Sequence, residues 1–240
     1  MATGVIANNR RTAANGRPTI VNGRLVRRRG EPTWEVVRAF PLQGHWSEDE
    51  YLAFERNSEN QMVELVNGFL EFLPMPVPIH QRIVGYSYRH LHAFAEQTGE
   101  GEVLMAPCPV RLWEGEMREP DLFFLKAGRI KDRHEPPEGA DLAIEVPSPG
   151  KENRKRDLRT KRRVYAKAKI GEYWIIDPET ETITVLTLSG KTYKVHGKFK
   201  PGQQATSKLL PERAATSAVT GAASGAAGGW LQLAFSTADS

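Results

Sequence analysis

The sequence predicts an α/β protein, more closely an α+β arrangement with a mixed sheet, and three observations lead to this class. First, two alternating apolar runs flank Asn67-Gly68 within residues 62–73, which is typical of a β-hairpin. Second, apolar residues recur at helical spacing over residues 79–97. Third, a basic helical segment over residues 152–169 lies between two compact apolar runs. This order of elements is expected where helices pack on a mixed sheet.

The chain of 240 residues and 26.8 kDa is of the size of one globular domain with tails. We expect residues 1–30, which carry seven arginines and no aromatic residue, to form a disordered basic arm. Residues 31–211 hold the folded domain. Residues 212–240 form a low-complexity tail with a short apolar patch at 230–235.

Composition excludes several classes of protein. The single cysteine, Cys108, excludes an intramolecular disulfide and any cysteine-rich zinc or iron–sulfur site. The first residues lack the apolar stretch of a signal peptide, and no run approaches the ~18 apolar residues of a membrane span. We therefore expect a cytoplasmic protein with no membrane partner. The net charge of +4 does not by itself indicate a polyanionic ligand.

The domain opens with a capped helix and a hairpin. Ser47 with Glu50 three residues later forms a capping box. In the hairpin, Asn67-Gly68 supplies the two positive-φ residues of a type I′ turn. A two-residue loop then places Glu64 directly across from Glu71, on the face opposite the core face of Val63, Leu65, Leu70 and Phe72.

The later elements follow from apolar runs bounded by proline, glycine or charged residues. Pro120 opens one strand, and a Pro-Ser-Pro-Gly sequence ends the strand DLAIEV. Gly171 is the expected C-cap of the basic helix. The expected strands are 103–105, 110–113, 120–125, 141–146, 172–177, 182–188 and 192–195.

Acidic residues in two of these strands are candidates for a metal site. Asp121 begins one apolar strand, and Glu145 lies near the end of another, on the face opposite Leu142 and Ile144. A buried carboxylate needs a partner or a metal ion. Either acid alone could instead be a strand-end charge that reaches solvent. Together with Glu64 they form a plausible site for a hard cation such as Mg²⁺ or Mn²⁺.

The basic helix adds a lysine in an unexpected position. Lys161 lies on the apolar stripe defined by Leu158 and Tyr165, whereas Arg159 and Arg163 belong to the opposite face. One interpretation is a lysine whose stem covers the core while its ammonium reaches solvent. The other is a lysine that points at the acids and stabilises developing negative charge. In either case Asp157 is its i,i+4 partner on the helix.

The charge of this helix is itself a signal. A run of like charge is usually a solvated face, but here ten cations stand against Glu152 and Asp157 within nineteen residues. This excess favours phosphate contacts with DNA, for which we nominate Lys155, Arg159 and Arg163. The ten cations are Lys151, Arg154, Lys155, Arg156, Arg159, Lys161, Arg162, Arg163, Lys167 and Lys169.

Other candidate side chains carry less information. His90 and His92 are two residues apart on a helix and cannot share one face, so they do not form a zinc pair. His80 precedes a helix and fits a capping role or a role behind the acids. Cys108, between two prolines, fits a structural role.

These segments resemble a known family. The stretches VELVNGFLEF, EPDLFFL, DLAIEVPSP, RDLRTKRRVYAKAKIGEYWIIDPE and SKLLP resemble the Uma-two family of restriction-endonuclease-like proteins, within the PD-(D/E)XK nuclease superfamily. The resemblance covers about Trp46 to Pro211. It implies a restriction-endonuclease-like core with flanking helices and a divalent metal held by two acids near a lysine.

The resemblance also implies roles for particular residues. Asp121 and Glu145 are the metal ligands, the carbonyl of Val146 is a third, and Glu64 is an accessory acid. Pro147 stands where the motif's lysine falls, and Lys161 from the following helix matches the place from which this family supplies it.

The sequence therefore predicts a Mg²⁺-dependent or Mn²⁺-dependent DNA endonuclease that hydrolyses phosphodiester bonds. We expect the tips of Asp121, Glu145 and Lys161 to converge within about 4–7 Å, with Glu64 on the rim of the same pocket. Two alternatives stay open: a non-catalytic DNA-binding or assembly module on a decayed nuclease scaffold, and a metal-dependent hydrolase of a small phosphodiester. A homodimer is also left open.

Overall fold

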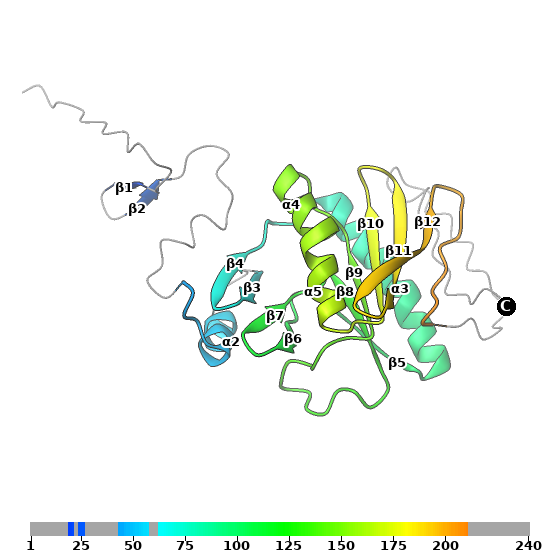
Figure 1. Cartoon of the computed structure of the whole chain (residues 1–240), viewed down its shortest axis with the longest axis horizontal. Helices are drawn as coiled ribbons and strands as arrows, with labels where there is room; N and C mark the ends of the chain where they lie inside the picture. Colours follow the sequence, from blue (N-terminus) through cyan, green and yellow to red (C-terminus); the bar gives the residue numbers. More distant parts are fainter. Residues whose placement is uncertain (1–18, 22–23, 27–42, 58–61, 211–240) are drawn as a thin grey trace, which may run out of the picture.

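The computed structural model describes residues 19–21, 24–26, 43–57 and 62–210 (Figure 1). Most of the expected basic arm and the expected tail from residue 212 onward lie outside these residues. Within the arm, β1 (Thr19–Val21) and β2 (Arg24–Val26) pair as an antiparallel hairpin, where no regular structure was expected. The sequence between the two strands is again Asn-Gly, a hairpin signal that our sequence analysis overlooked.

A six-stranded mixed sheet forms the centre of the fold, in the order β12-β11-β10-β9-β8-β5. Its single parallel pair is β9 with β10, and the other neighbours are antiparallel. The mixed sheet predicted from the sequence is thereby confirmed. The strands are β5 (Gly101–Met105), β8 (Leu122–Lys126), β9 (Leu142–Glu145), β10 (Glu172–Asp177), β11 (Thr182–Ser189) and β12 (Thr192–Phe199).

Helices cover both faces of this sheet (Figure 1). The helix α3 (Pro78–Thr98) packs Ile83 and Leu91 against one face, which carries Leu142 and Ile144. The other face carries Ala143 and meets Tyr165 of the basic helix. The alternation of DLAIEV therefore divides its side chains between two cores, as the sequence predicts.

The basic helix is continuous but not uniform. Its parts are α4 (Lys151–Lys155), a π-helical segment η1 (Arg156–Thr160) and α5 (Lys161–Lys167). The helix ends at Lys167, earlier than expected. The left-handed conformation typical of a helix C-terminus, which we expected at Gly171, is adopted by Lys169, with φ 60°. A salt bridge and hydrogen bonds from Arg154 to Asp177 tie the start of the helix to the end of β10.

A second, four-stranded antiparallel sheet has the order β4-β3-β7-β6 and packs against α2 (Glu48–Asn57). The capping box is confirmed, since Ser47 N–H and Oγ both donate to Glu50 Oε2. The hairpin has the predicted register, with Asn67 and Gly68 at φ 48° and 80°. The strands are β3 (Val63–Val66), β4 (Phe69–Phe72), β6 (Val110–Trp113) and β7 (Glu116–Arg118).

The strand β7 was not predicted, because its sequence Glu-Met-Arg has no apolar alternation. It continues the pairing of β3, in which Leu65 lies opposite Met117. One step further along the two strands, Arg118 comes opposite Glu64, so a buried cation faces a buried acid. Within the described residues, none of the helices is long and apolar enough to cross a membrane.

Candidate functional site

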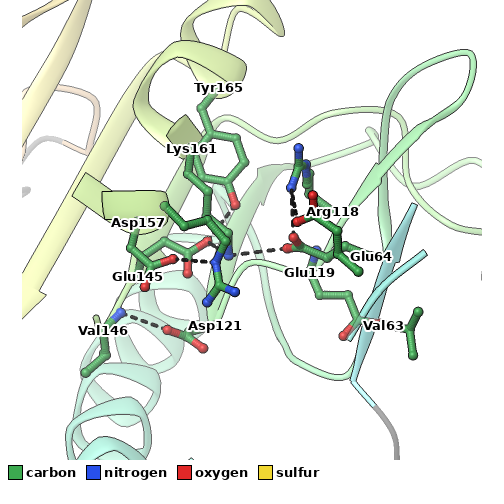
Figure 2. A network of polar contacts seen from close by, with 12 residues as sticks. Val63, Glu64, Arg118, Glu119, Asp121, Glu145, Val146, Asp157, Lys161 and Tyr165 are labelled. Atoms are coloured by element: carbon green, nitrogen blue, oxygen red, sulfur yellow. Dashed lines mark hydrogen bonds and ion pairs between the residues drawn. The ribbon is translucent and has the colours of Figure 1, made fainter. Parts of the chain in front are cut away.

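Asp121 and Glu145 lie side by side because their strands are neighbours. Asp121 directly precedes β8, and Glu145 is the last residue of β9. In this antiparallel pair Leu122 faces Ile144, so the next position along the register places Asp121 opposite Glu145. Both side chains are buried, and both line one small pocket. The proximity expected from the sequence is therefore present (Figure 2).

The Asp121 carboxylate is held through one of its two oxygens. Its Oδ2 accepts the backbone N–H of Val146 at 2.7 Å and lies 3.2 Å from Nε2 of His80. Both contacts fall on Oδ2, so Oδ1 carries neither of them. Asp121 is thus fixed from the side of α3 and β9 while it borders the pocket.

Glu145 is also held through only one of its two carboxylate oxygens. Its Oε1 accepts hydrogen bonds from Lys161 Nζ at 2.8 Å and from the Tyr165 hydroxyl at 2.6 Å. Burial and the nearby Asp121 raise the pKa of Glu145, whereas the adjacent Lys161 ammonium favours the ionised carboxylate and opposes the rise. The contact of Tyr165 with Glu145 was not predicted, because the sequence indicated Tyr165 only as a core residue. Its spacing of four residues from Lys161, which places both on one helix face, was the signal that could have revealed it.

Lys161 is a buried ammonium between two acids. Its side chain is 2% exposed, and its Nζ also lies 3.3 Å from Oε1 of Glu64. Burial lowers the pKa of Lys161, but the nearby Glu145 and Glu64 outweigh this and raise it above the ordinary value. A lysine that sends its ammonium to solvent is therefore ruled out.

The expected helical partner of Lys161 is engaged elsewhere. Asp157 accepts a hydrogen bond from Arg156 Nε at 3.2 Å, and the ion pairs of Lys161 go to Glu145 and Glu64. The helix between them is the π-helical segment, in which the N–H of Lys161 bonds to the carbonyl of Arg156, five residues earlier. Such single π turns occur frequently at functional sites.

Glu64 lies behind the lysine rather than on the rim where it was expected. It is fully buried and accepts bonds from Arg118 Nη1 at 2.9 Å and from the N–H of Glu119 at 3.1 Å. Burial raises the pKa of Glu64, but Lys161 and Arg118 outweigh it and hold the pKa at about 2. Glu64 is therefore ionised and tied to Lys161 in the network of Figure 2.

Glu119 is a further acid that the sequence analysis did not single out. It is fully buried and lines the same pocket. Burial raises the pKa of Glu119 to about 10, and the nearby acids Glu55 and Glu64 add to the rise. Within the described residues, neither of its carboxyl oxygens has a hydrogen-bond partner.

The pocket at these acids is small. Its volume of about 20 Å³ suffices for a water molecule or a single ion. Asp121, Glu145 and Lys161 border it together with Asp157, and the apolar residues Leu73 and Pro74 also contribute to the lining. Among the residues that the structure describes, no three His, Cys, Asp or Glu side chains are grouped so that they could hold a metal ion.

Six of the ten cations of the basic helix fall into two sets. Arg154, Arg156 and Arg162 are used internally: they contact Asp177, Asp157 and the carbonyl of Tyr193, respectively. The second set, Lys155, Arg159 and Arg163, is exposed on the face away from Lys161. Part of the charge excess therefore serves the fold, and the nominated contact residues belong to the exposed part.

The fold is that of a mixed α+β protein with a six-stranded and a four-stranded sheet. It is similar to the crystal structure of a "putative nuclease belonging to DUF820" from Anabaena variabilis ATCC 29413, with a TM-score of 0.51 and 18% identity. The similarity covers 62% of this chain and 83% of that one. At this identity the likeness establishes the fold.

The family follows from the sequence itself. Residues 48–219 match Uma2, a family described as "Putative restriction endonuclease". Because the match spans more than half of the chain, the chain belongs to the Uma2 family, as its sequence motifs indicated. No curated protein matches the sequence.

Proposed function

We propose that this Uma2 protein is a divalent-metal-dependent DNA endonuclease that hydrolyses phosphodiester bonds. One observation carries the proposal: Asp121 and Glu145 face each other on neighbouring strands, each tied down through a single oxygen, and a buried lysine contacts one of them. Carboxylates fixed in this way are suited to binding a cation. A lysine beside them is suited to stabilising negative charge.

The available oxygens fit Mg²⁺ or Mn²⁺. Mg²⁺ is usually bound by one or two carboxylates and keeps several of its waters, so the two carboxylates of Asp121 and Glu145 agree with its chemistry. In this proposal Asp121, Glu145 and the carbonyl of Val146 hold the ion. When bound, it supplies an acidified water and neutralises charge on the scissile phosphate.

Lys161 and Glu64 have separate roles in the proposal. Lys161 donates to the attacking water or to the oxygen on which negative charge develops, and so lowers the barrier. Glu64 is buried behind the ammonium, bound to Arg118 and Lys161. We therefore assign Glu64 to holding Lys161 in place, and not to contact with the substrate.

The exposed cations of the basic helix supply the DNA contacts in this proposal. Lys155, Arg159 and Arg163 follow one another at i,i+4 spacing, which places them in a row along one helix face. A row of cations on one helix can follow a phosphate backbone without reading its sequence.

Plasmid nicking tests the proposal. Wild-type protein with Mg²⁺ or Mn²⁺ should nick supercoiled DNA, and EDTA should abolish nicking. Asp121→Asn and Glu145→Gln should each reduce the rate by at least about 100-fold, since each removes a charged ligand but little volume. The matched controls are Asp132→Asn and Glu102→Gln, which make the same changes at exposed positions.

The other outcomes favour the alternatives. Nicking by both acid variants at the wild-type rate would show that the catalytic assignment is wrong. DNA binding without any metal-dependent cleavage would favour a non-catalytic module.

A further inference from the structure

His80 is buried at the edge of the site and contacts one of its acids. It lies in the first turn of α3, is 6% exposed, and places Nε2 3.2 Å from Oδ2 of Asp121. The same oxygen accepts the N–H of Val146 at 2.7 Å. Two donors from different elements, a helix and the end of a strand, therefore converge on one oxygen of Asp121.

The tautomer of a neutral His80 ring follows from its partners. A carboxylate oxygen only accepts hydrogen bonds, so a neutral His80 must carry its proton on Nε2 to bond Asp121. The other nitrogen, Nδ1, is buried and has no hydrogen-bond partner in the part of the chain that the structure describes. A proton on Nδ1 would be a buried donor without an acceptor, which disfavours that tautomer. The hydrogen bond between Nε2 and Asp121 is thus the polar contact of the buried His80 ring.

We propose that His80 is the positioning residue of Asp121. With both bonds on Oδ2, the carboxylate cannot turn about its χ2 angle without losing a donor, and Oδ1 stays at the pocket. Without His80, the carboxylate would be held by the Val146 N–H alone, and the site would lose part of its order before a cation binds. This inference rests on the proposed metal-binding function of Asp121.

Two substitutions separate this role from simple filling of space. The amide nitrogen of glutamine lies about as far from Cα as Nε2 of histidine does, so His80→Gln can still donate to Asp121. The amide of asparagine is at the distance of Nδ1 and does not reach. His92→Asn is the matched control, because His92 lies on the same helix but pairs with Glu96 away from the pocket.

The readout is the affinity for Mn²⁺, measured on the full chain by electron paramagnetic resonance of free Mn²⁺, with circular dichroism to verify folding. His80→Asn should weaken Mn²⁺ binding by about tenfold or more, whereas His80→Gln should stay within about threefold of wild type. His92→Asn should have no effect. Equal affinity in wild type and a folded His80→Asn variant would overturn the positioning role while leaving the metal site intact.

A measurement on the wild type makes the test independent of whether a variant folds. Nitrogen-15 spectra of the imidazoles should show His80 as the Nε2–H tautomer, and Mg²⁺ should shift its signals but not those of His92. An Nδ1–H tautomer would overturn the inference. Failure of the wild type to bind Mn²⁺ at all would overturn the proposed function, and this inference with it.

Discussion

Lys161 is the side chain on which the charge balance of the site depends. Its ammonium lies within 3.3 Å of Glu64 and 2.8 Å of Glu145, and all three side chains are almost completely buried. Burying ions is costly unless each has partners, and removing one member of such a group leaves the others uncompensated. The lysine therefore contributes both to stability and, in our proposal, to catalysis.

Substitution of Lys161 should separate rate from binding. In our proposal the ammonium acts on the transition state, so Lys161→Ala should lower the cleavage rate at saturating DNA by at least about 100-fold and leave DNA affinity nearly unchanged. Lys161→Arg keeps the charge but replaces a compact ammonium by a planar fork, so it should retain binding and lose most activity. Single-turnover cleavage and a binding titration measure the two quantities.

Arg163→Ala is the control for the lysine variants, because it removes a cation from the exposed face of the same helix. It should weaken binding more than rate. If Lys161→Ala changed only the affinity, Lys161 would have no role in the chemical step.

Glu64 should make the stability of the protein depend on pH in the acidic range. Its pKa is about 2 in the folded protein, below the ~4.3 of an unfolded glutamate. A lowered pKa contributes stability that is fully present above the unfolded value and is lost as the pH falls toward 2. This difference corresponds to about 3 kcal/mol. Glu64→Gln should therefore be less stable than wild type at pH 7, and the two should approach each other as the pH falls.

Urea unfolding between pH 7 and pH 2.5 measures this effect. Glu114→Gln, at an exposed position, is the control and should follow the wild-type curve. A gap between wild type and Glu64→Gln that stayed constant with pH would contradict the ionised, ion-paired state of Glu64.

At the scale of elements, periodic signals in the sequence located the parts of the site but not their final contacts. The alternation of DLAIEV placed Glu145 on the correct face of β9, and Asn67-Gly68 fixed the register of the hairpin that carries Glu64. The π turn was not predictable in this way, since its residues have the same helical character as those beside it. The expected pairing of Asp157 with Lys161 was wrong, since Asp157 bonds to Arg156 and Lys161 to Glu145 and Glu64.

Pairing between strands that are far apart in the sequence explains why Glu64 does not lie on the rim of the pocket. Glu64 was expected on the rim because β7 was unknown, and it is β7 that brings Arg118 opposite Glu64 and buries both. A three-residue strand with two charged side chains has no apolar alternation to mark it in the sequence. Arg118 pairs with Glu116 in the same strand and also with Glu64, 54 positions away along the chain. Contacts of this kind depend on the assembled sheet.

At the scale of the whole molecule, our proposal for DNA binding rests on the distribution of charge and not on the net charge. The chain carries only +4, yet exposed cations follow one another along one face of the basic helix. If this face contacts DNA, each phosphate contact releases counterions and adds about one unit to the salt dependence of binding. The distribution of charge over the surface, and not the net charge, then sets the affinity for DNA.

Arg159→Ala and Arg163→Ala should each weaken DNA binding and reduce the magnitude of the salt slope by about one unit. Binding isotherms at several salt concentrations, in Ca²⁺ to prevent cleavage, measure the slope. Lys126→Ala is the control, because Lys126 is exposed at the opposite end of β8 from Asp121. A slope unchanged in both arginine variants would exclude this helix face as the DNA contact.

The π turn also determines what the deletion of one residue would do to the basic helix. A segment with i→i+5 bonds holds one residue more than a regular α-helix would, so the loss of one residue from Arg156–Thr160 would still leave a helix. A π turn and an α turn each complete about one revolution, so the residues before the deletion would keep nearly the same orientation relative to those after it. With Tyr165 and Ala166 anchored in the core, Arg154 would therefore stay near Asp177. A single-residue deletion here would thus preserve both the helix and its buried face, whereas the same deletion within α5 would rotate the two sides by about 100°.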